Sequence, residues 1–213
     1  MTPRDGVGAG AWAQAVEQLV RTMGGWCNAH THLDRANTFA PEFLQHANID
    51  PMGAAGLSLR VKQILVGELH KGPAYQPDNL YARMRAELER MEAAGVREVI
   101  SFIDATPDIG LVAIHQAARL RDEFRGRLTF KIAVSPIFGF KNPALNPDRW
   151  ETYRQAAEIA DVLGGLPVKD RAEGRVGFDG HVRMVLELAH RLRKPVHFQV
   201  DQDNDPREDE TEQ

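Results

Sequence analysis

Two histidines, His30 and His32, are the residues of this chain whose type and spacing point most directly to chemistry. They end the short stretch 26–33, which follows Gly24-Gly25 and is too short for a helix, so it is predicted to form a buried strand. Side chains two apart in a strand point to the same face, so the two imidazoles are expected to converge. Neutral imidazole binds zinc or iron, and the pair is therefore a candidate metal site. Histidines two apart also occur by chance, so this interpretation depends on their place at the end of a strand.

A second group of polar residues follows the last predicted strand, 195–200. His197, Gln199 and Asp201 share one face by the same alternation, and Gln202 lies on the turn that follows. A glutamine amide oxygen can bind a metal weakly, but it does not titrate and cannot carry a proton. His197 is expected to lie one layer below the rim, which favours a core histidine with a hydrogen-bond partner.

Three further charged residues are expected at the same rim. Asp104 ends the second predicted strand, and Lys169-Asp170 follows the fourth. This position favours contact with substrate, although each residue could equally form a structural ion pair or cap a helix. A Ser-His-Asp or Cys-His site has little support, because the chain has no Gly-x-Ser-x-Gly elbow and Cys27 lies within the first strand, where it is expected to be a small buried hydrophobe.

The elements that must position these residues alternate between strands and helices. Strands are predicted over 26–33, 96–103, 128–134, 162–166 and 195–200, and helices over 11–23, 57–69, 78–94 with Asp78 as N-cap, 109–124, 148–160 and 180–192. Strands separated by helices imply parallel βαβ units with right-handed crossovers. We therefore predict one α/β domain over 26–205 with an insertion at about 36–77, preceded by an N-terminal arm and helix over 1–25 and followed by an acidic tail over 206–213.

Composition limits the classes of function. The 213 residues include 26 Lys and Arg against 30 Asp and Glu, a net charge of -4 without a basic stripe, so nucleic acid is not an expected partner. A single cysteine excludes an internal disulfide and suits a reducing compartment. The sequence contains neither a long apolar run nor a basic-then-apolar leader, so we expect a cytoplasmic protein without a membrane span.

The sequence from Asn28 to Asp34, Asn-Ala-His-Thr-His-Leu-Asp, resembles the amidohydrolase superfamily, whose first barrel strand ends in a His-x-His metal motif. The nearest branch is that of cytosine deaminase and related ring hydrolases. The similarity continues, in the order of that family's strands two to five, through 103–106, 132–136, 164–167 and 200–205.

The resemblance implies a (β/α)8 TIM-like barrel, represented here by about five βα units, and hydrolysis of a C–N bond in a small nitrogen-containing compound. It implies a divalent metal, zinc first and iron or manganese next, bound by His30, His32 and Gln199. Asp201 and Gln202 would occupy the catalytic positions, while Asp104, Lys169 and Asp170 would contact the substrate.

The sequence departs from the family at the fifth strand. The usual His-x-Asp-Glu is replaced by Gln199, Val200, Asp201 and Gln202, which removes a strong ligand and the group that moves protons. Cytosine itself is not the expected substrate, because Ile137 follows Pro136 where the family has a substrate-reading Gln.

Five parallel strands leave two open edges, so we expect a homo-oligomer or a complementing chain. Two alternatives stay open: a catalytically silent binding or assembly subunit, and a flavodoxin-like open sheet with reversed strand order.

Overall fold

The computed structural model describes residues 7–46, 50, 53, 59–202, 207, 209 and 211. Its centre is a five-stranded parallel sheet in the order β1-β2-β3-β4-β5. The strands are β1 (Trp26–Thr31), β2 (Val96–Asp104), β3 (Thr129–Ser135), β4 (Val162–Gly165) and β5 (Val196–Phe198). Because spatial order equals sequence order, the sheet has no reversal point, and the flavodoxin-like alternative is wrong.

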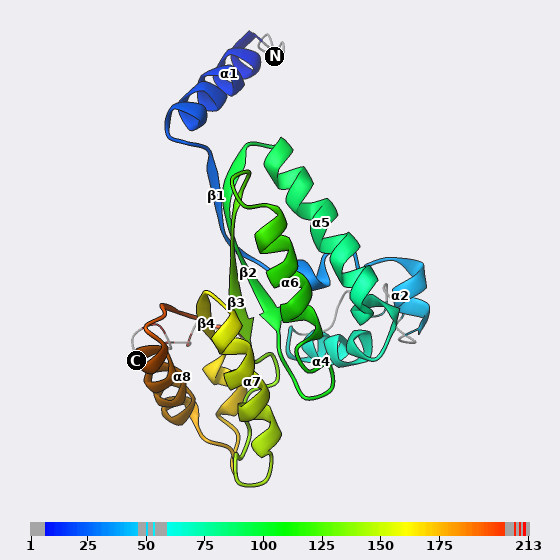
Figure 1. Ribbon diagram of the computed structural model, residues 1–213, viewed down its shortest axis with the longest axis vertical. Helices are drawn as coiled ribbons and strands as arrows, with labels where there is room; N and C mark the ends of the chain where they lie inside the picture. The colour runs from blue at the N-terminus through cyan, green and yellow to red at the C-terminus, as the bar shows by residue number, and fades with distance from the viewer. Residues whose placement is uncertain are drawn as a thin grey trace.

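Apart from the N-terminal helix, the helices lie between successive strands, and the longer ones within residues 77–192 pack against one side of the sheet (Figure 1). The helices are α1 (Val7–Thr22), α2 (Pro41–His46), α4 (Leu59–His70), α5 (Pro77–Ala93), α6 (Val112–Glu123), α7 (Pro147–Ile159) and α8 (Phe178–Leu192), with short 3-10 turns η1 (Leu33–Arg35), η2 (Pro73–Tyr75) and η3 (Pro167–Asp170). The predicted elements are confirmed to within a few residues. The predicted cap of α5 is wrong, since Gln76 is the N-cap and Pro77 takes the first helical position.

The two faces of the sheet differ in what covers them. Val99 and Ile103 of β2 belong to the large apolar core under the helices, whereas Phe102 points to the opposite face and packs with Ala133 and Val162. This second face corresponds to the inside of a barrel, and we call it the lumen face. The five strands thus form a curled half-barrel, an incomplete TIM-like barrel.

Both edges of the sheet are open within the described residues. Most of β1 is exposed, and all three residues of β5 are only half-buried. Cys27 is therefore exposed, and the expectation that it is a small buried hydrophobe is wrong. The cause is its place in an edge strand without a neighbour on its other side.

A β-bulge in β1 changes which face its side chains point to. Asn28 pairs with Val99 and Thr31 pairs with Ser101, so β1 advances three residues while β2 advances two. Asn28 Nδ2 contacts the Met91 sulfur of α5 at 3.8 Å, on the helix side. The extra residue shifts the alternation by one, and the histidines that follow lie on the lumen face.

The N-terminal helix α1 projects away from the rest of the chain (Figure 1). Its apolar residues Trp12 and Leu19, and Met23 just after it, are more than half exposed. Among the described residues, no helix has the length and apolarity needed to cross a membrane.

Candidate functional site

Three histidines from the two edge strands gather on the lumen face around one phenyl ring. The ring centroid of His30 lies 5.3 Å from that of His32 and 5.2 Å from that of His197. All three imidazoles lie against Phe102, with centroid distances of 4.8, 5.6 and 4.8 Å. The predicted convergence of His30 and His32 therefore holds, and the fold brings His197 of β5 to the same place.

The position of Phe102 is set by a glycine on β4. A Cβ atom added at Gly164 would lie 2.6 Å from the Phe102 ring and 2.2 Å from the Val134 carbonyl oxygen. Only a residue without a side chain leaves room for the phenyl ring there. The lumen floor beneath the histidines is thus apolar and closely packed.

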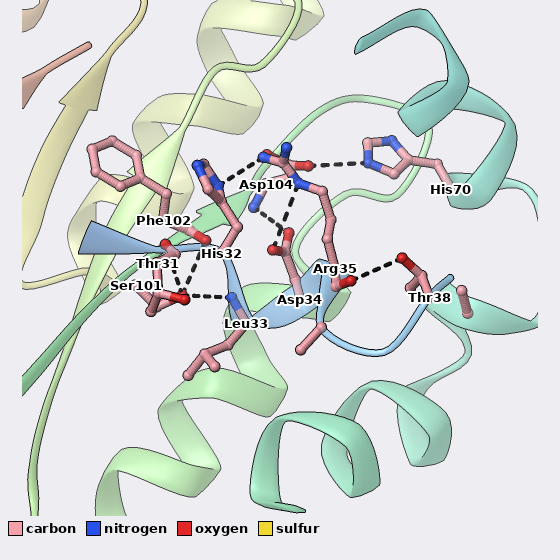
Figure 2. A network of polar contacts seen from close by, with 12 residues as sticks. Thr31, His32, Leu33, Asp34, Arg35, Thr38, His70, Ser101, Phe102 and Asp104 are labelled. Atoms are coloured by element: carbon pink, nitrogen blue, oxygen red, sulfur yellow. Dashed lines mark hydrogen bonds and ion pairs between the residues drawn. The ribbon is translucent and has the colours of Figure 1, made fainter. Parts of the chain in front are cut away.

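Next to His32, the turn η1 begins a buried polar network (Figure 2). Arg35 Nη2 donates to His32 Nδ1 at 2.9 Å and to Asp104 Oδ1 at 3.0 Å. The Asp104 backbone N–H donates to Asp34 Oδ2 at 2.9 Å. Both carboxylates are fully buried, and the guanidinium lies between them and the histidine.

The network continues to α4 through His70. Its Nε2 lies 3.3 Å from Asp104 Oδ2, and its Nδ1 lies 2.8 Å from Asp108 Oδ2. Tyr75 adds a hydroxyl that donates to Asp34 Oδ2 at 3.1 Å. One continuous polar chain therefore runs from His32 on the lumen face to Asp108.

The charges in this network follow from burial and from close partners. Burial, and then the neighbouring Asp104, raise the pKa of Asp34 to about 6. Burial opposes ionisation of Asp104, but the Arg35 guanidinium and the His70 hydrogen bond hold its pKa well below its usual range. Burial likewise opposes protonation of His70, yet its two carboxylate partners raise its pKa to about 9. At neutral pH, Asp104 is ionised and His70 is an imidazolium.

The three lumen histidines are neutral. Burial, followed by the charge of Arg35, lowers the pKa of His32 to about 3. Burial, the neighbouring His197 and Arg35 lower the pKa of His30, and burial lowers that of His197. Neutral imidazoles retain a lone pair, which a metal ligand requires.

The described residues nevertheless do not fit a metal site as they are arranged. No group of three or more His, Cys, Asp or Glu in the described part of the chain is placed to hold an ion. Arg35 can only donate, so His32 Nδ1 is an acceptor and the neutral ring carries its proton on Nε2. In this tautomer neither nitrogen of His32 has a free lone pair, because Nδ1 accepts from Arg35 and Nε2 carries the proton, whereas a metal-binding histidine coordinates through one nitrogen and normally donates from the other. Metal binding by His32 requires Arg35 to move.

A pocket of about 870 Å³ opens beside this network, between the ends of α4 and α7 and the turn η3. Asp108 lies on its wall, and two of the predicted residues, Lys169 and Gln202, line it. Gln202 Nε2 lies 3.5 Å from the Val200 carbonyl oxygen, and Asp201 accepts a hydrogen bond from Thr211. Gln199 donates its backbone N–H to the Gly165 carbonyl oxygen at 2.9 Å.

Asp170 lies beneath the pocket rather than on its wall. Its carboxylate accepts backbone hydrogen bonds from Phe140 and Lys141, both at 2.8 Å, and one from His181 Nδ1 at 2.7 Å. His181 Nε2 accepts from the Leu166 backbone N–H, which fixes the Nδ1 proton toward Asp170. Contact of Asp170 with a substrate stays a prediction, as do the roles predicted for Asp104, Lys169, Asp201 and Gln202.

Several residues of the site are absent from the sequence-based prediction. Arg35, His70, Tyr75 and Asp108 belong to the network, and Phe102 centres the histidines. His197 was expected to be a core histidine with a hydrogen-bond partner, which is wrong: it is half-buried at the open edge. The polar turn Leu33-Asp34-Arg35 was a usable signal for Arg35, but no local pattern marks His70.

Known proteins resemble this chain in sequence and in fold. No family model matches the chain. An uncharacterized protein of Haemophilus influenzae is 32% identical over 195 residues, which is 89% of this chain and 64% of that relative. The chain thus spans less than two thirds of the length of the relative.

Solved structures with the same fold are hydrolytic deaminases and related enzymes. The 5-methylcytosine deaminase of Klebsiella pneumoniae, liganded with phosphonocytosine, matches 88% of this chain and 42% of its own at a TM-score of 0.72 and 22% identity. The N-isopropylammelide isopropylaminohydrolase of Burkholderia multivorans matches 82% of this chain and 40% of its own, at a TM-score of 0.59 and 23% identity.

The chain therefore has the fold of the amidohydrolase superfamily, represented by five βα units that span about two fifths of those structures. The resemblance that the sequence shows to this superfamily is confirmed at the level of the fold.

Proposed function

We propose that this chain provides the first five βα units of a hydrolase that cleaves a C–N bond in a small nitrogen-containing compound. The observation that carries the proposal is the gathering of His30, His32 and His197 on the lumen face of a fold shared with a deaminase and an aminohydrolase. Phe102 itself is fully buried beneath them, so a planar heterocycle would stack on the more exposed imidazole rings of His30 and His197.

We expect little or no turnover by the isolated chain. Hydrolysis of this kind needs a group that transfers protons, and the glutamines at 199 and 202 cannot do so. Asp104 and His70 titrate far from neutrality, and Asp34, whose pKa is about 6, is fully buried and out of contact with solvent. Activity is therefore expected only when further side chains face the lumen, from a second copy or from another polypeptide that pairs with the open edges of β1 and β5.

A divalent metal, with zinc as the first candidate, is part of this proposal only for the completed barrel. His30, His32 and Gln199 remain the predicted ligands. In the isolated chain, elemental analysis of purified protein is expected to find much less than one zinc, iron or manganese per chain. Near-stoichiometric metal that disappears in His30→Ala would contradict the arrangement of Arg35 and His32 described above.

The test separates the protein by size and assays each fraction. Aminopyrimidines, aminotriazines and cyclic amides are offered with each metal, and release of ammonia or amine is measured. We expect turnover only in fractions heavier than one 23.8 kDa chain, with loss of activity in His30→Ala. Arg125→Gln, in the exposed turn that follows α6, is the control.

The second candidate function is a catalytically silent binding or assembly subunit. The observation behind it is the Arg35 guanidinium, which donates to His32 Nδ1 where a metal ligand needs a free lone pair. If heavy fractions bind a heterocycle, detected by shifts of the imidazole proton resonances, but release no ammonia with any metal, the silent subunit replaces the hydrolase.

A further inference from the structure

The pocket beside α4 and α7 carries an excess of positive charge, although the whole chain is acidic. Five cationic side chains line it, namely Lys71, Lys141, Arg149, Lys169 and Arg175, against the three carboxylates of Glu68, Asp108 and Asp148. The chain as a whole has a net charge of -4. The concentration of cations in this concavity is therefore a local feature.

Two of the three carboxylates are already neutralised. Glu68 pairs with Lys71 at 2.7 Å, and Asp108 pairs with the His70 imidazolium at 2.8 Å. Among the described residues, Lys141, Arg149 and Arg175 form no ion pair with a carboxylate, and Arg175 Nη1 donates only to the Lys169 carbonyl oxygen, which leaves its other guanidinium N–H groups for an anion. Asp148 is the one acid left to face them.

The three unpaired cations repel one another. Burial, followed by the charges of Arg149 and Arg175, lowers the pKa of Lys141, and the attraction of Asp148 and Asp170 does not compensate. Like charges held together in a partly buried pocket raise the free energy of the unliganded protein. A bound anion would relieve that repulsion.

Backbone hydrogen bonds fix the segments that carry two of these cations, Lys141 and Arg175. Lys141 has a positive φ of 58° and donates its N–H to Asp170, while its carbonyl accepts from Val176 at 3.0 Å. Gly177 donates to the Asp170 carbonyl at 3.1 Å, so the segment carrying Arg175 is tied to the same buried aspartate. A Cβ at Gly139 would lie 2.6 Å from Asp170 Oδ1, which makes that turn fit only a glycine.

We propose that this pocket binds a small anionic molecule through its carboxylate or phosphate group, recognised by Lys141, Arg149 and Arg175. Guanidinium groups donate paired hydrogen bonds to both kinds of anion, and a pocket of this volume accommodates a small ligand. Asp170 acts as a positioning residue that fixes the two segments. The inference rests on the pocket alone and does not depend on C–N hydrolysis.

The test measures binding of inorganic phosphate and of malonate by calorimetry at constant ionic strength, with chloride as the replaced anion. We expect saturable binding of one anion per chain, and a loss of affinity of about tenfold or more in Lys141→Gln/Arg149→Gln. Arg125→Gln/Arg21→Gln removes the same charge from an exposed turn and from the exposed helix α1, and is expected to leave the affinity unchanged. Binding of phosphate alone or of malonate alone identifies the anionic group.

Thermal unfolding gives a second measurement that does not require the variant to bind. Without ligand, Lys141→Gln/Arg149→Gln is expected to unfold at the same temperature as the parent or higher, because repulsion is removed. Phosphate or malonate should raise the unfolding temperature of the parent but not that of the variant. Equal stabilisation of both proteins, or binding that only the surface control weakens, would overturn the proposal.

Discussion

The Asp104 backbone N–H donates a 2.9 Å hydrogen bond to Asp34 Oδ2, which joins two fully buried carboxylates at the ends of neighbouring strands. Their environments differ, because Asp104 also faces Arg35 and His70, whereas Asp34 Oδ1 has no hydrogen-bond partner. One aspartate is therefore stabilised in its charged form and the other in its neutral form. The first two predictions below follow from this difference.

Asp34→Asn should alter the pH dependence of stability between about pH 4 and pH 6. The folded-state pKa of Asp34, about 6, is above the 3.8 of an exposed aspartate, so its proton stabilises the folded chain below pH 4 and this contribution is lost as the pH rises through 6. The stability of the parent relative to Asp34→Asn should fall over that interval in urea unfolding. A difference that rises with pH would contradict the sign. Asp108→Asn is the control, because its pKa of about 2 places its effect below pH 4.

The parent protein should lose unfolding free energy at alkaline pH, and His70→Gln should abolish this loss. The folded-state pKa of His70, about 9, is raised above 6.5, so the stabilising proton is fully present below pH 6.5 and is lost as the pH rises through 9. The parent should lose a few kcal/mol of unfolding free energy relative to the variant between pH 6.5 and 9.5. Parallel curves for the two proteins would show that His70 is not protonated in the folded state.

Tyr153→Phe should destabilise the chain by about 1 to 3 kcal/mol. The Tyr153 hydroxyl is fully buried and donates to the Gly164 carbonyl oxygen at 2.7 Å, so its removal leaves a buried acceptor without a partner. Tyr81→Phe is a matched control, since its hydroxyl contacts Glu123 at the surface and should contribute within about 0.5 kcal/mol. Chemical denaturation of both variants decides the comparison, and equal effects would contradict the structure.

Gly164→Ala should destabilise the half-barrel by about 1 to 3 kcal/mol or more through overpacking. The new methyl group would meet the Val134 carbonyl oxygen and the Phe102 ring at less than 3 Å. Displacement of Phe102 should also shift the imidazole resonances of His30 and His197, which lie against it. Gly10→Ala, in the first turn of the exposed helix α1 with open space around it, should instead gain up to about 0.5 to 1 kcal/mol. A neutral effect at Gly164 would show that the lumen is loosely packed.

The order of elements could be predicted from the sequence because apolar periodicity is local. The convergence of His30 and His32 followed from the alternation at the end of β1. The partners of these histidines could not be predicted in the same way, since Arg35 and His70 meet Asp104 only through long-range folding. Asp104 is 34 residues from His70 and 69 from Arg35 along the chain.

The exposure of side chains on the edge strands could not be predicted from the sequence pattern either. Cys27 and His197 belong to stretches that resemble buried strands, yet each lies on a strand with a neighbour on one side only. Apolar composition indicates that a segment is a strand, but it does not indicate whether another strand flanks it.

Because of the bulge in β1, the face of the sheet on which the histidines lie depends on the number of residues in the strand as well as on their type. Deleting Ala29 would remove this bulge and rotate the preceding part of the strand by half a turn relative to the histidines. Asn28 would then face the lumen and lose its contact with Met91. Removal of one residue from β1 therefore changes which side chains border the lumen, without substituting any residue there.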